Sequence, residues 1–321
     1  MRAWVFDHYG PPEELELREV PLPSFRDENE VLVRVHAASV NPADRHALKL
    51  PFIFRRGQGF LRPKMGRLGG DLAGRIERVG QNVKELHVGD EVFGVGRGTF
   101  AEYAIADQGQ LALKPSALTF EQVAAVPIAA TTALQGLRDK AQVRPGQQVL
   151  INGASGGVGT FAVQIARSLG GQVSGVCSSQ NQEMARSLGA SRVFDYSRED
   201  FTKSGQRYDI LFDTQLNHTL AAYRGALVPH GVLLAVGGGT GAAGPALRRV
   251  IKKLVGARFL GPQIKFFVAS VNQADLNALT RLLVAGTIAP VLDRHYQLEQ
   301  VPDAIRYLSE GHARGKIVVT I

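Results

Sequence analysis

The sequence predicts an α/β fold that combines a doubly wound parallel sheet with a second, β-rich domain. From residue 148 onward, short apolar runs alternate with helical stretches, as expected of a parallel sheet with helices on both faces. Residues 1–118 instead show short apolar segments with turn signals about every ten residues, which favours a small barrel or sandwich. A chain of 321 residues is also long enough for two cores.

The first domain is predicted from its strands and turns. The segment "EVLVRVHAASV" at 30–40 is alternating or continuously apolar over the length of a strand, and "DLAGRIERVG" and "DEVFGVG" are shorter apolar segments with glycine. The pattern changes at residues 119–137, "TFEQVAAVPIAATTALQGL", where the apolar residues have helical spacing. Thr119 is the expected N-cap, and Gln122 three residues later completes a capping box. We therefore place a domain boundary after residue 118.

The second domain is predicted from strand-length apolar runs and the helices between them. Helical spacing of apolar residues recurs at 158–170, 181–189 and 218–227. The tail, 290–321, ends in a strand that can pair back into the first domain. The predicted strands of the parallel sheet are 148–153, 172–177, 192–196, 208–213 and 231–236.

Composition and charge exclude several classes of protein. No run of about 18 uncharged apolar residues occurs, so no membrane-spanning helix is expected. The N-terminal "MRAWVFDHYG" has the pattern of neither a signal nor a transit peptide, and a single cysteine suits a reducing compartment, so we expect a cytoplasmic protein. The net charge of +8 comes from scattered basic residues without interleaved aromatic residues or nucleic-acid-binding motifs, so no nucleic-acid partner is expected.

The strongest chemical signal is the glycine-dense turn in "VLINGASGGVGTFAVQIARSLG", residues 149–170. An apolar strand enters the turn and a helix leaves it, which is the context that a dinucleotide-binding G-x-G-x-x-G motif requires. The three key places are Ala154, Gly156 and Gly159. Gly156 would allow the backbone to approach a pyrophosphate, and Gly159 would allow the helix to pack closely on the strand. N–H groups at 155–158 would meet the phosphates at the positive end of the helix dipole.

The end of the second strand of this sheet indicates which nicotinamide cofactor binds. In this fold an Asp or Glu about 20 residues after the motif accepts hydrogen bonds from the adenosine ribose of NAD. The corresponding segment here, "CSSQN" at 177–181, contains no acidic residue. Small hydroxyl groups can bind a 2′-phosphate that a carboxylate would repel, so the sequence favours NADPH. No arginine stands in this turn, and Arg186, about two helical turns on, is more simply an exposed helix residue.

Six segments fall in the order and spacing of a known family over nearly the whole chain. They are "AASVNPAD" (37–44), "GGDLAGRIERVG" (69–80), "GDEVFG" (89–94), "GTFAEYAIA" (98–106), "AAVPIAATTAL" (124–134) and "GASGGVG" (153–159). Together they resemble the medium-chain dehydrogenase/reductase superfamily, and in particular its zinc-independent quinone oxidoreductase-like branch. Within that branch, "DYSREDF" (195–201), "FFVAS" (266–270) and "EGHARGKIVVTI" (310–321) are most similar to the reticulon-4-interacting protein 1 group and its bacterial relatives.

This resemblance implies the domain organisation, the oligomer and the absence of a metal. A GroES-like barrel would be formed by 1–118 and completed by 259–321, with an NADP(H)-binding Rossmann domain at 119–258 between them. A homodimer is implied because relatives usually pair the edge strands of their nucleotide-binding domains. Zinc-dependent members have a catalytic cysteine and a Gly-His-Glu segment, whereas the aligned residues 69–71 are Gly-Gly-Asp and Cys177 is the only cysteine. No set of Cys and His with zinc spacing remains, so we expect no metal.

The resemblance also transfers cofactor contacts onto positions of this chain. Ser178 and Tyr196 match contacts to the 2′-phosphate and the adenosine, and Asn181 stands where related quinone reductases often have a lysine, which weakens the NADPH preference without reversing it. Thr131 matches a threonine near the nicotinamide, although a helical threonine can also bond to its own backbone. An apolar trio such as 266–268 is also common in a core. The expected cofactor-binding residues are Thr131, Ser155, Gly156, Gly157, Val158, Ser178, Tyr196, Phe266, Phe267, Val268, His312 and Arg314.

Two residues are candidates for catalysis. Asn41 matches the loop that lines the substrate site in the family, and its alternative role is that of a turn residue before Pro42. His46 takes the place of a tyrosine found in several quinone reductases, and a histidine there could donate a proton or hydrogen-bond a carbonyl near neutral pH. The alternative for His46, one of eight histidines, is a solvated loop position, which is the commoner situation.

These observations predict an NADPH-dependent, zinc-independent reductase that transfers hydride to a quinone or an α,β-unsaturated carbonyl. An alcohol or aldehyde dehydrogenase is an alternative, disfavoured because no metal or Tyr-Lys pair is apparent to polarise a carbonyl. A non-enzymatic NADPH-binding sensor or scaffold is the other alternative. The variable loop around 50–68 would shape the substrate pocket.

Overall fold

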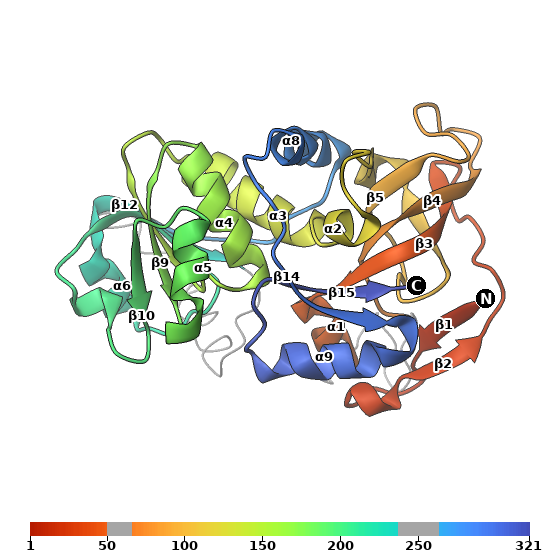
Figure 1. Cartoon of the computed structure of the whole chain (residues 1–321), viewed down its shortest axis with the longest axis horizontal. Coiled ribbons are helices and arrows are strands. Elements are labelled where there is room, and N and C mark those ends of the chain that lie inside the picture. The colour runs from red at the N-terminus through yellow and green to blue at the C-terminus, as the bar shows by residue number, and fades with distance from the viewer. Residues whose placement is uncertain (50–65, 237–262) are drawn as a thin grey trace. The chain divides into compact units, whose positions relative to one another are not determined.

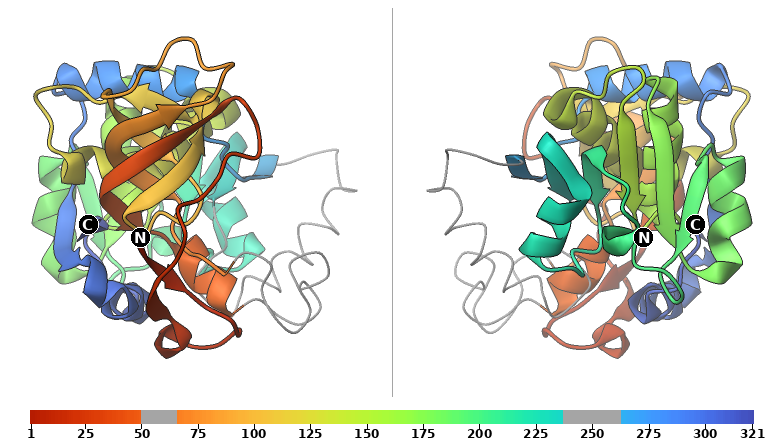
Figure 2. Two further views of the ribbon diagram at one scale, coloured as in Figure 1. Left: turned by 90° about the vertical axis from the view of Figure 1, so that its right-hand side faces the viewer. Right: turned by 90° about the vertical axis from the view of Figure 1, so that its left-hand side faces the viewer.

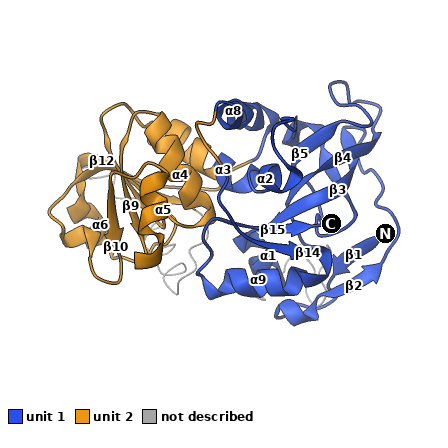
Figure 3. Ribbon diagram, viewed as in Figure 1, with its two compact units in different colours: residues 1–131, 271–285, 290–321 blue, residues 132–270, 286–289 orange. Residues whose placement is uncertain are grey.

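The computed structural model describes residues 1–49, 66–236 and 263–321 of the chain, whose helices and strands are labelled in Figure 1. The chain divides into two compact units, coloured separately in Figure 3. Unit 1 consists of residues 1–131, 271–285 and 290–321, and unit 2 of residues 132–270 and 286–289. Most of the loop expected to shape the substrate pocket lies outside the described residues, and so does the domain boundary expected after residue 258.

Unit 1 is built on a seven-stranded sheet whose central strand is β3 (Glu30–Val40). β3 is the apolar run expected at 30–40, and it pairs antiparallel with β4, β6 and β15. β15 belongs to the C-terminal tail, so the expected return of the tail to the first domain is confirmed. The other strands are β4 (Asp71–Val79), β5 (Glu91–Val95), β6 (Tyr103–Asp107), β7 (Leu111–Leu113), β14 (Leu292–Gln297) and β15 (Lys316–Thr320), and a separate two-stranded sheet contains β1 (Arg2–Val5) and β2 (Glu16–Glu19).

The helices of unit 1 pack their apolar sides on this sheet. α9 contacts β15 and α1, and its Ile305 lies in one buried cluster with Trp4, Leu48 and Val319. α8 contacts β7 at the far end of the sheet order. The helices are α1 (Pro42–Leu48), α2 (Phe120–Ala124), α8 (Gln273–Val284) and α9 (Val301–Glu310), with 3₁₀ turns at Pro12–Glu14, Gln108–Gln110 and Leu298–Gln300.

The helix expected over 119–137 is interrupted. Its start is as expected, because Gln122 N donates to Thr119 Oγ1 at 3.2 Å and Thr119 N donates to Gln122 Oε1 at 2.9 Å. α2 ends at Ala124, and α3 (Pro127–Leu134) begins at Pro127, whose fixed φ and missing N–H suit a first helical position but not a helix interior. A π-helical turn, Gln135–Ala141, then follows. Unit 1 runs on to Thr131 because α2 packs on β3 and β4.

Unit 2 is built on a parallel sheet in the order β10-β9-β8-β11-β12-β13. The chain forms β8, β9 and β10 in one direction across the sheet and then returns to the other side of β8 with β11. The strand order therefore reverses between β8 and β11, and ligands of open α/β sheets bind at such a point, beyond the carboxyl ends of the strands. The strands are β8 (Gln148–Asn152), β9 (Gln172–Cys177), β10 (Arg192–Asp195), β11 (Tyr208–Asp213), β12 (Leu227–Val236) and β13 (Gln263–Phe267).

Helices lie on both sides of this sheet (Figure 2). α4 contacts β8 and β9, α5 contacts β9 and β10, and α6 contacts β12. A buried cluster that includes Leu150, Phe194, Leu211 and Tyr223 joins the sheet to α6. The helices are α4 (Gly157–Ser168), α5 (Gln182–Ser187) and α6 (Leu220–Ala226), with 3₁₀ turns at Ser179–Asn181 and Phe201–Lys203. No helix among the described residues is long and apolar enough to cross a membrane.

Candidate functional site

The turn between β8 and α4 requires glycine for steric reasons. Gly153 has a φ of +91°, a left-handed conformation that glycine adopts without strain. A Cβ added to Gly159 would overlap the carbonyl oxygen of Gly153, so the close packing expected of Gly159 is confirmed. A Cβ on Gly156 would meet, among the described atoms, only the Gly153 carbonyl oxygen, at 3.5 Å. The described protein therefore leaves open the side of the turn where the motif brings a phosphate close to the backbone.

The four residues expected to contact the pyrophosphate, Ser155, Gly156, Gly157 and Val158, lie together at the N-terminus of α4. Gly156 is the N-cap and has no side chain to bond the first turn of the helix. The first N–H groups of a helix have no intrahelical acceptor, and they stand at the positive end of the helix dipole. The turn thus presents donors and positive potential to an anion, as a dinucleotide pyrophosphate requires.

Ser178 follows β9, at the same carboxyl end of the parallel strands as the turn after β8. Asn181 Nδ2 donates to Ser178 Oγ at 3.0 Å, so the hydroxyl proton of Ser178 is free to be donated to another acceptor. Tyr196, at the end of the neighbouring strand, is 58% exposed and presents its ring to solvent. Cys177 is buried, and burial raises the pKa of its thiol to about 11, so this cysteine stays protonated at neutral pH.

A buried carboxylate contacts this turn from the adjacent strand, outside the spacing that residues 177–181 cover. Asp195 ends β10, where it pairs in register with Cys177 of β9. It is only 1% exposed and accepts hydrogen bonds from the hydroxyls of Ser179 and Ser197, with Arg198 Nε at 3.6 Å. The two serine hydroxyls hold the pKa of Asp195 below its ordinary value. Because Ser179 donates its proton to Asp195, Ser178 is the serine of the pair with a free proton.

Unit 1 contains a buried ionic network that joins its N-terminal and C-terminal segments. The Lys316 ammonium, 3% exposed, donates to Asn41 Oδ1 at 2.7 Å and lies 3.2 Å from Asp71 Oδ2. The Asp71 carboxylate, fully buried, also accepts from Ser39 Oγ at 2.6 Å, Asn41 Nδ2 at 2.8 Å and the backbone N–H of Ile128 at 2.9 Å. Charged residues within the apolar segments "GGDLAG" and "GKIVVTI" were the available sequence signal for this network.

Asn41 and Asp44 extend the network into the start of α1. Asn41 Nδ2 also approaches the carbonyl of Ser39 at 3.3 Å, so the carboxamide of Asn41 is engaged with its own unit. Asp44 accepts from the backbone N–H groups of Asn41 at 2.8 Å and Gly69 at 3.0 Å. Burial raises the pKa of Asp44 to about 6, with the Asp71 carboxylate acting in the same direction against the two backbone hydrogen bonds. These contacts fix the turn that carries Asn41.

His46 lies on α1, one and a half turns after Asn41 in a helix that begins at Pro42. His46 is exposed, and Arg45 Nη2 lies 3.4 Å from its Nε2. Partial burial and the adjacent Arg45 guanidinium lower the pKa of His46. The imidazole is therefore mainly neutral at pH 7.

The remaining expected cofactor residues occupy different settings. Thr131 is fully buried on α3, and its Oγ1 has no hydrogen-bond partner among the described residues. At the end of β13 and just beyond it, Phe266 and Val268 are exposed, whereas Phe267 is 8% exposed. His312 and Arg314 lie in the exposed segment between α9 and β15, and the Arg314 backbone N–H donates to Asp293 Oδ2 at 2.9 Å.

Comparison with known proteins identifies the family. Residues 27–116 match the family model of the alcohol dehydrogenase GroES-like domain, and residues 188–319 match that of the zinc-binding dehydrogenases. The mitochondrial NAD(P)H oxidoreductase RTN4IP1 of Mus musculus is 34% identical over 367 residues, which cover 100% of this chain and 89% of the mouse protein. The chain belongs to the medium-chain dehydrogenase/reductase superfamily.

Two further superfamily members are similar over almost the whole chain. The chloroplastic NADPH-dependent alkenal/one oxidoreductase of Arabidopsis thaliana is 32% identical over 338 residues, which cover 99% of this chain and 79% of the plant protein. The solved structure of the quinone oxidoreductase of Coxiella burnetii superposes with a TM-score of 0.87 at 30% identity and covers 100% of this chain and 99% of its own.

These comparisons fix the fold and the general activity of this superfamily member. Unit 1 contains the GroES-like domain and unit 2 the Rossmann-type nucleotide-binding domain. The chain is an NAD(P)H-dependent oxidoreductase that acts on a small molecule. One matching family model is named for zinc binding, but within the described residues no group of three or more His, Cys, Asp or Glu could hold a metal ion.

Proposed function

We propose that this protein is an NADPH-dependent, zinc-independent reductase of quinones or α,β-unsaturated carbonyls. The observation that carries the proposal is the set of contacts made by Asp71, which lies in the segment where zinc-dependent relatives have Gly-His-Glu. Its Oδ2 accepts from Ser39 and Asn41 and lies 3.2 Å from the Lys316 ammonium, and its Oδ1 accepts from a backbone N–H, so the carboxylate is neutralised and held by its own unit. Without a Lewis acid, the favoured hydride acceptors are conjugated systems that stabilise the added charge themselves.

The proposed mechanism assigns most of the work to positioning. Bound NADPH would supply hydride from its nicotinamide ring. The turn at 155–158 would hold the pyrophosphate through backbone N–H groups. The Thr131 hydroxyl, which has no partner among the described residues, would meet the nicotinamide end. We assign Asn41 a positioning role, because its carboxamide is bonded to Lys316 and Asp71. Protonation of the reduced substrate would come from solvent or from His46. Pairing of two copies through nucleotide-domain edge strands remains our proposal for the oligomer.

The activity is tested by NADPH oxidation with 9,10-phenanthrenequinone and with a panel of enones and aldehydes, before and after dialysis against a strong chelator. We expect turnover of the quinone or an enone, little turnover of a saturated aldehyde, and no change in activity or melting temperature after dialysis. Stoichiometric zinc that is lost together with activity would contradict the zinc-free proposal. NADPH binding without turnover of any acceptor would favour the sensor alternative.

Ser178 is expected to set the preference for NADPH over NADH. Its free hydroxyl proton can be donated to a 2′-phosphate, and with the neighbouring N–H groups it should favour NADPH by about tenfold or more, since hydrogen bonds to charged groups contribute about 1.5–3 kcal/mol each. Ser178→Asp should invert the preference, because a carboxylate repels the phosphate and accepts from ribose hydroxyls. Titration calorimetry with both cofactors measures this, and Ser187→Asp, on the outer part of α5, is the matched control. Equal affinities in the unmodified protein would refute the claim.

A further inference from the structure

The loop that follows β11, residues 214–219, lies against the phosphate-binding turn of unit 2. β8 and β11 are adjacent, and their last residues, Asn152 and Asp213, are paired in register at the point where the strand order reverses. Thr214 donates to the Asn152 carbonyl twice, from N at 3.2 Å and from Oγ1 at 2.9 Å. A Cβ on Gly153, the first residue of the turn, would overlap Thr214 Oγ1 and lie 2.6 Å from Gln215 Nε2. The loop therefore borders the turn directly.

A buried carboxylate fixes the backbone of this loop. Asp213 is fully buried, and its Oδ1 accepts from the N–H groups of Gln215 at 2.7 Å and Leu216 at 2.8 Å. Leu216 has a φ of +53°, a left-handed conformation that is unfavourable for a branched side chain. Unfavourable backbone conformations held by surrounding contacts cluster at ligand-binding sites. The loop conformation is thus imposed, and it sets the place of Asn217, the next residue.

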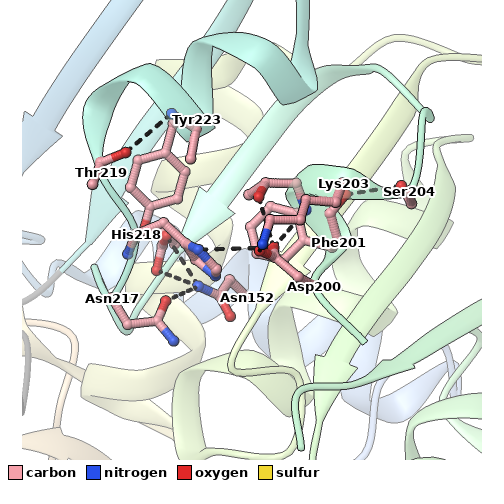
Figure 4. A network of polar contacts seen from close by, with 12 residues as sticks. Asn152, Asp200, Phe201, Lys203, Ser204, Asn217, His218, Thr219 and Tyr223 are labelled. Atoms are coloured by element: carbon pink, nitrogen blue, oxygen red, sulfur yellow. Dashed lines mark hydrogen bonds and ion pairs between the residues drawn. The ribbon is translucent and has the colours of Figure 1, made fainter. Parts of the chain in front are cut away.

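The same carboxylate also orients Asn217, through Asn152. Figure 4 shows the side chains of Asn152 and Asn217 directed toward each other. Both oxygens of Asp213 accept from Asn152 Nδ2, each at 3.1 Å, so the amide nitrogen of Asn152, and not its oxygen, faces Asp213. That nitrogen also lies 3.0 Å from the side chain of Asn217, which must therefore present its oxygen, Oδ1. Asp213 thus fixes the orientation of the Asn152 amide, which in turn fixes that of the Asn217 amide. The Asn217 Nδ2, with two N–H donors, is therefore directed away from Asn152. Asn217 is exposed, and none of the contacts described for this network uses its Nδ2.

We propose that Asn217 is a cofactor-binding residue, whose Nδ2 donates a hydrogen bond to an oxygen of the adenosine diphosphate half of the bound dinucleotide. Three features meet at this place: a donor with a fixed direction, a backbone conformation held against its preference, and direct packing on the turn that receives the pyrophosphate. The proposal depends on nicotinamide-dinucleotide binding, which the superfamily shares. It does not depend on NADPH preference or on a quinone or enone substrate.

The test compares Asn217→Ala and Asn217→Asp with the unmodified protein by titration calorimetry, using NADPH, NADH and ADP-ribose. Loss of one hydrogen bond to a charged group should weaken all three ligands by about tenfold to a hundredfold in Asn217→Ala. Asn217→Asp should weaken them further, because it replaces the donor with a negative charge near the phosphates. The ratio of NADPH to NADH affinity should stay unchanged in both variants, whereas Ser178→Asp changes that ratio, so a failure of the Ser178 claim is distinguishable from a failure here.

The matched control is Gln172→Ala. Gln172 is also an exposed carboxamide, and its oxygen accepts from a neighbouring carboxamide, Gln148 Nε2, at 2.6 Å. It begins β9, however, and so lies at the amino end of the parallel strands, opposite the phosphate-binding turn. This variant should bind all three ligands normally. Normal binding by Asn217→Ala with an unchanged melting temperature would overturn the proposal. Weakened NADPH with normal ADP-ribose would place the contact on the nicotinamide half and overturn it too.

Discussion

Lys316→Met is expected to lower the free energy of unfolding by about 3–5 kcal/mol, the usual result of removing one partner of a buried ion pair. The ammonium is 3% exposed and is the cation beside the fully buried Asp71. Methionine fills a similar volume, so the loss reports the uncompensated charge of Asp71 and the free Asn41 Oδ1 more than a cavity. Denaturant titration, monitored by circular dichroism, measures the change. The melting temperature provides a second measurement.

A second variant separates the ion pair from its surroundings. Asp71→Asn alone should also destabilise the protein, because it leaves Lys316 charged and buried. The double variant Lys316→Met with Asp71→Asn should lose less than the sum of the two single losses, since no unpaired charge remains. Arg306→Met is the control within unit 1: Arg306 forms exposed ion pairs with Glu13 and Asp303, and its loss should cost less than about 1 kcal/mol. Additive losses would show that Lys316 and Asp71 do not act as a pair.

Local patterns predicted most of the fold. The strand at 30–40, the glycine-dense turn and the five strands of the parallel sheet each carry their signal within a few adjacent residues, and the structure contains all of them. The capping box at Thr119 was correct for the same reason. The helix expected to continue to residue 137 was wrong in its continuity, because Pro127 starts a new helix in place of extending the first.

Much of the candidate site could not be read from spacing, because its contacts join distant segments. Lys316 and Asp71 are 245 residues apart in sequence and meet because β15 and β4, which carry them, both pair with β3. Asp195 is not indicated by the spacing from the glycine motif to the end of β9, because it reaches Ser179 from the adjacent strand β10. Asn217 carries no motif at all. The orientation of its amide follows from the buried Asp213 carboxylate, because Asn152 is hydrogen-bonded to both residues.

His46→Phe is expected to lower kcat for enones by about 10²-fold, the usual size of a general-acid contribution. The reduced enone is a basic enolate that needs a proton, whereas a hydroquinone anion is less basic and can take its proton from water. Quinone turnover should therefore fall much less, and NADPH affinity should stay the same. Steady-state kinetics on one enone and one quinone, together with a calorimetric Kd for NADPH, measure all three quantities.

The pH dependence decides whether His46 acts as the acid. Partial burial and Arg45 lower its pKa, so the imidazolium donor is scarce at pH 7 and becomes more abundant as the pH falls. The enone rate of the unmodified protein should therefore rise toward pH 5.5, and the rise should be absent from His46→Phe. Arg45→Gln removes one of the two causes that lower the pKa and should move the rise to higher pH. His87→Phe, at a largely exposed histidine, should change nothing. An enone rate that His46→Phe leaves unaltered across pH 5.5 to 8.5 would assign the proton to solvent.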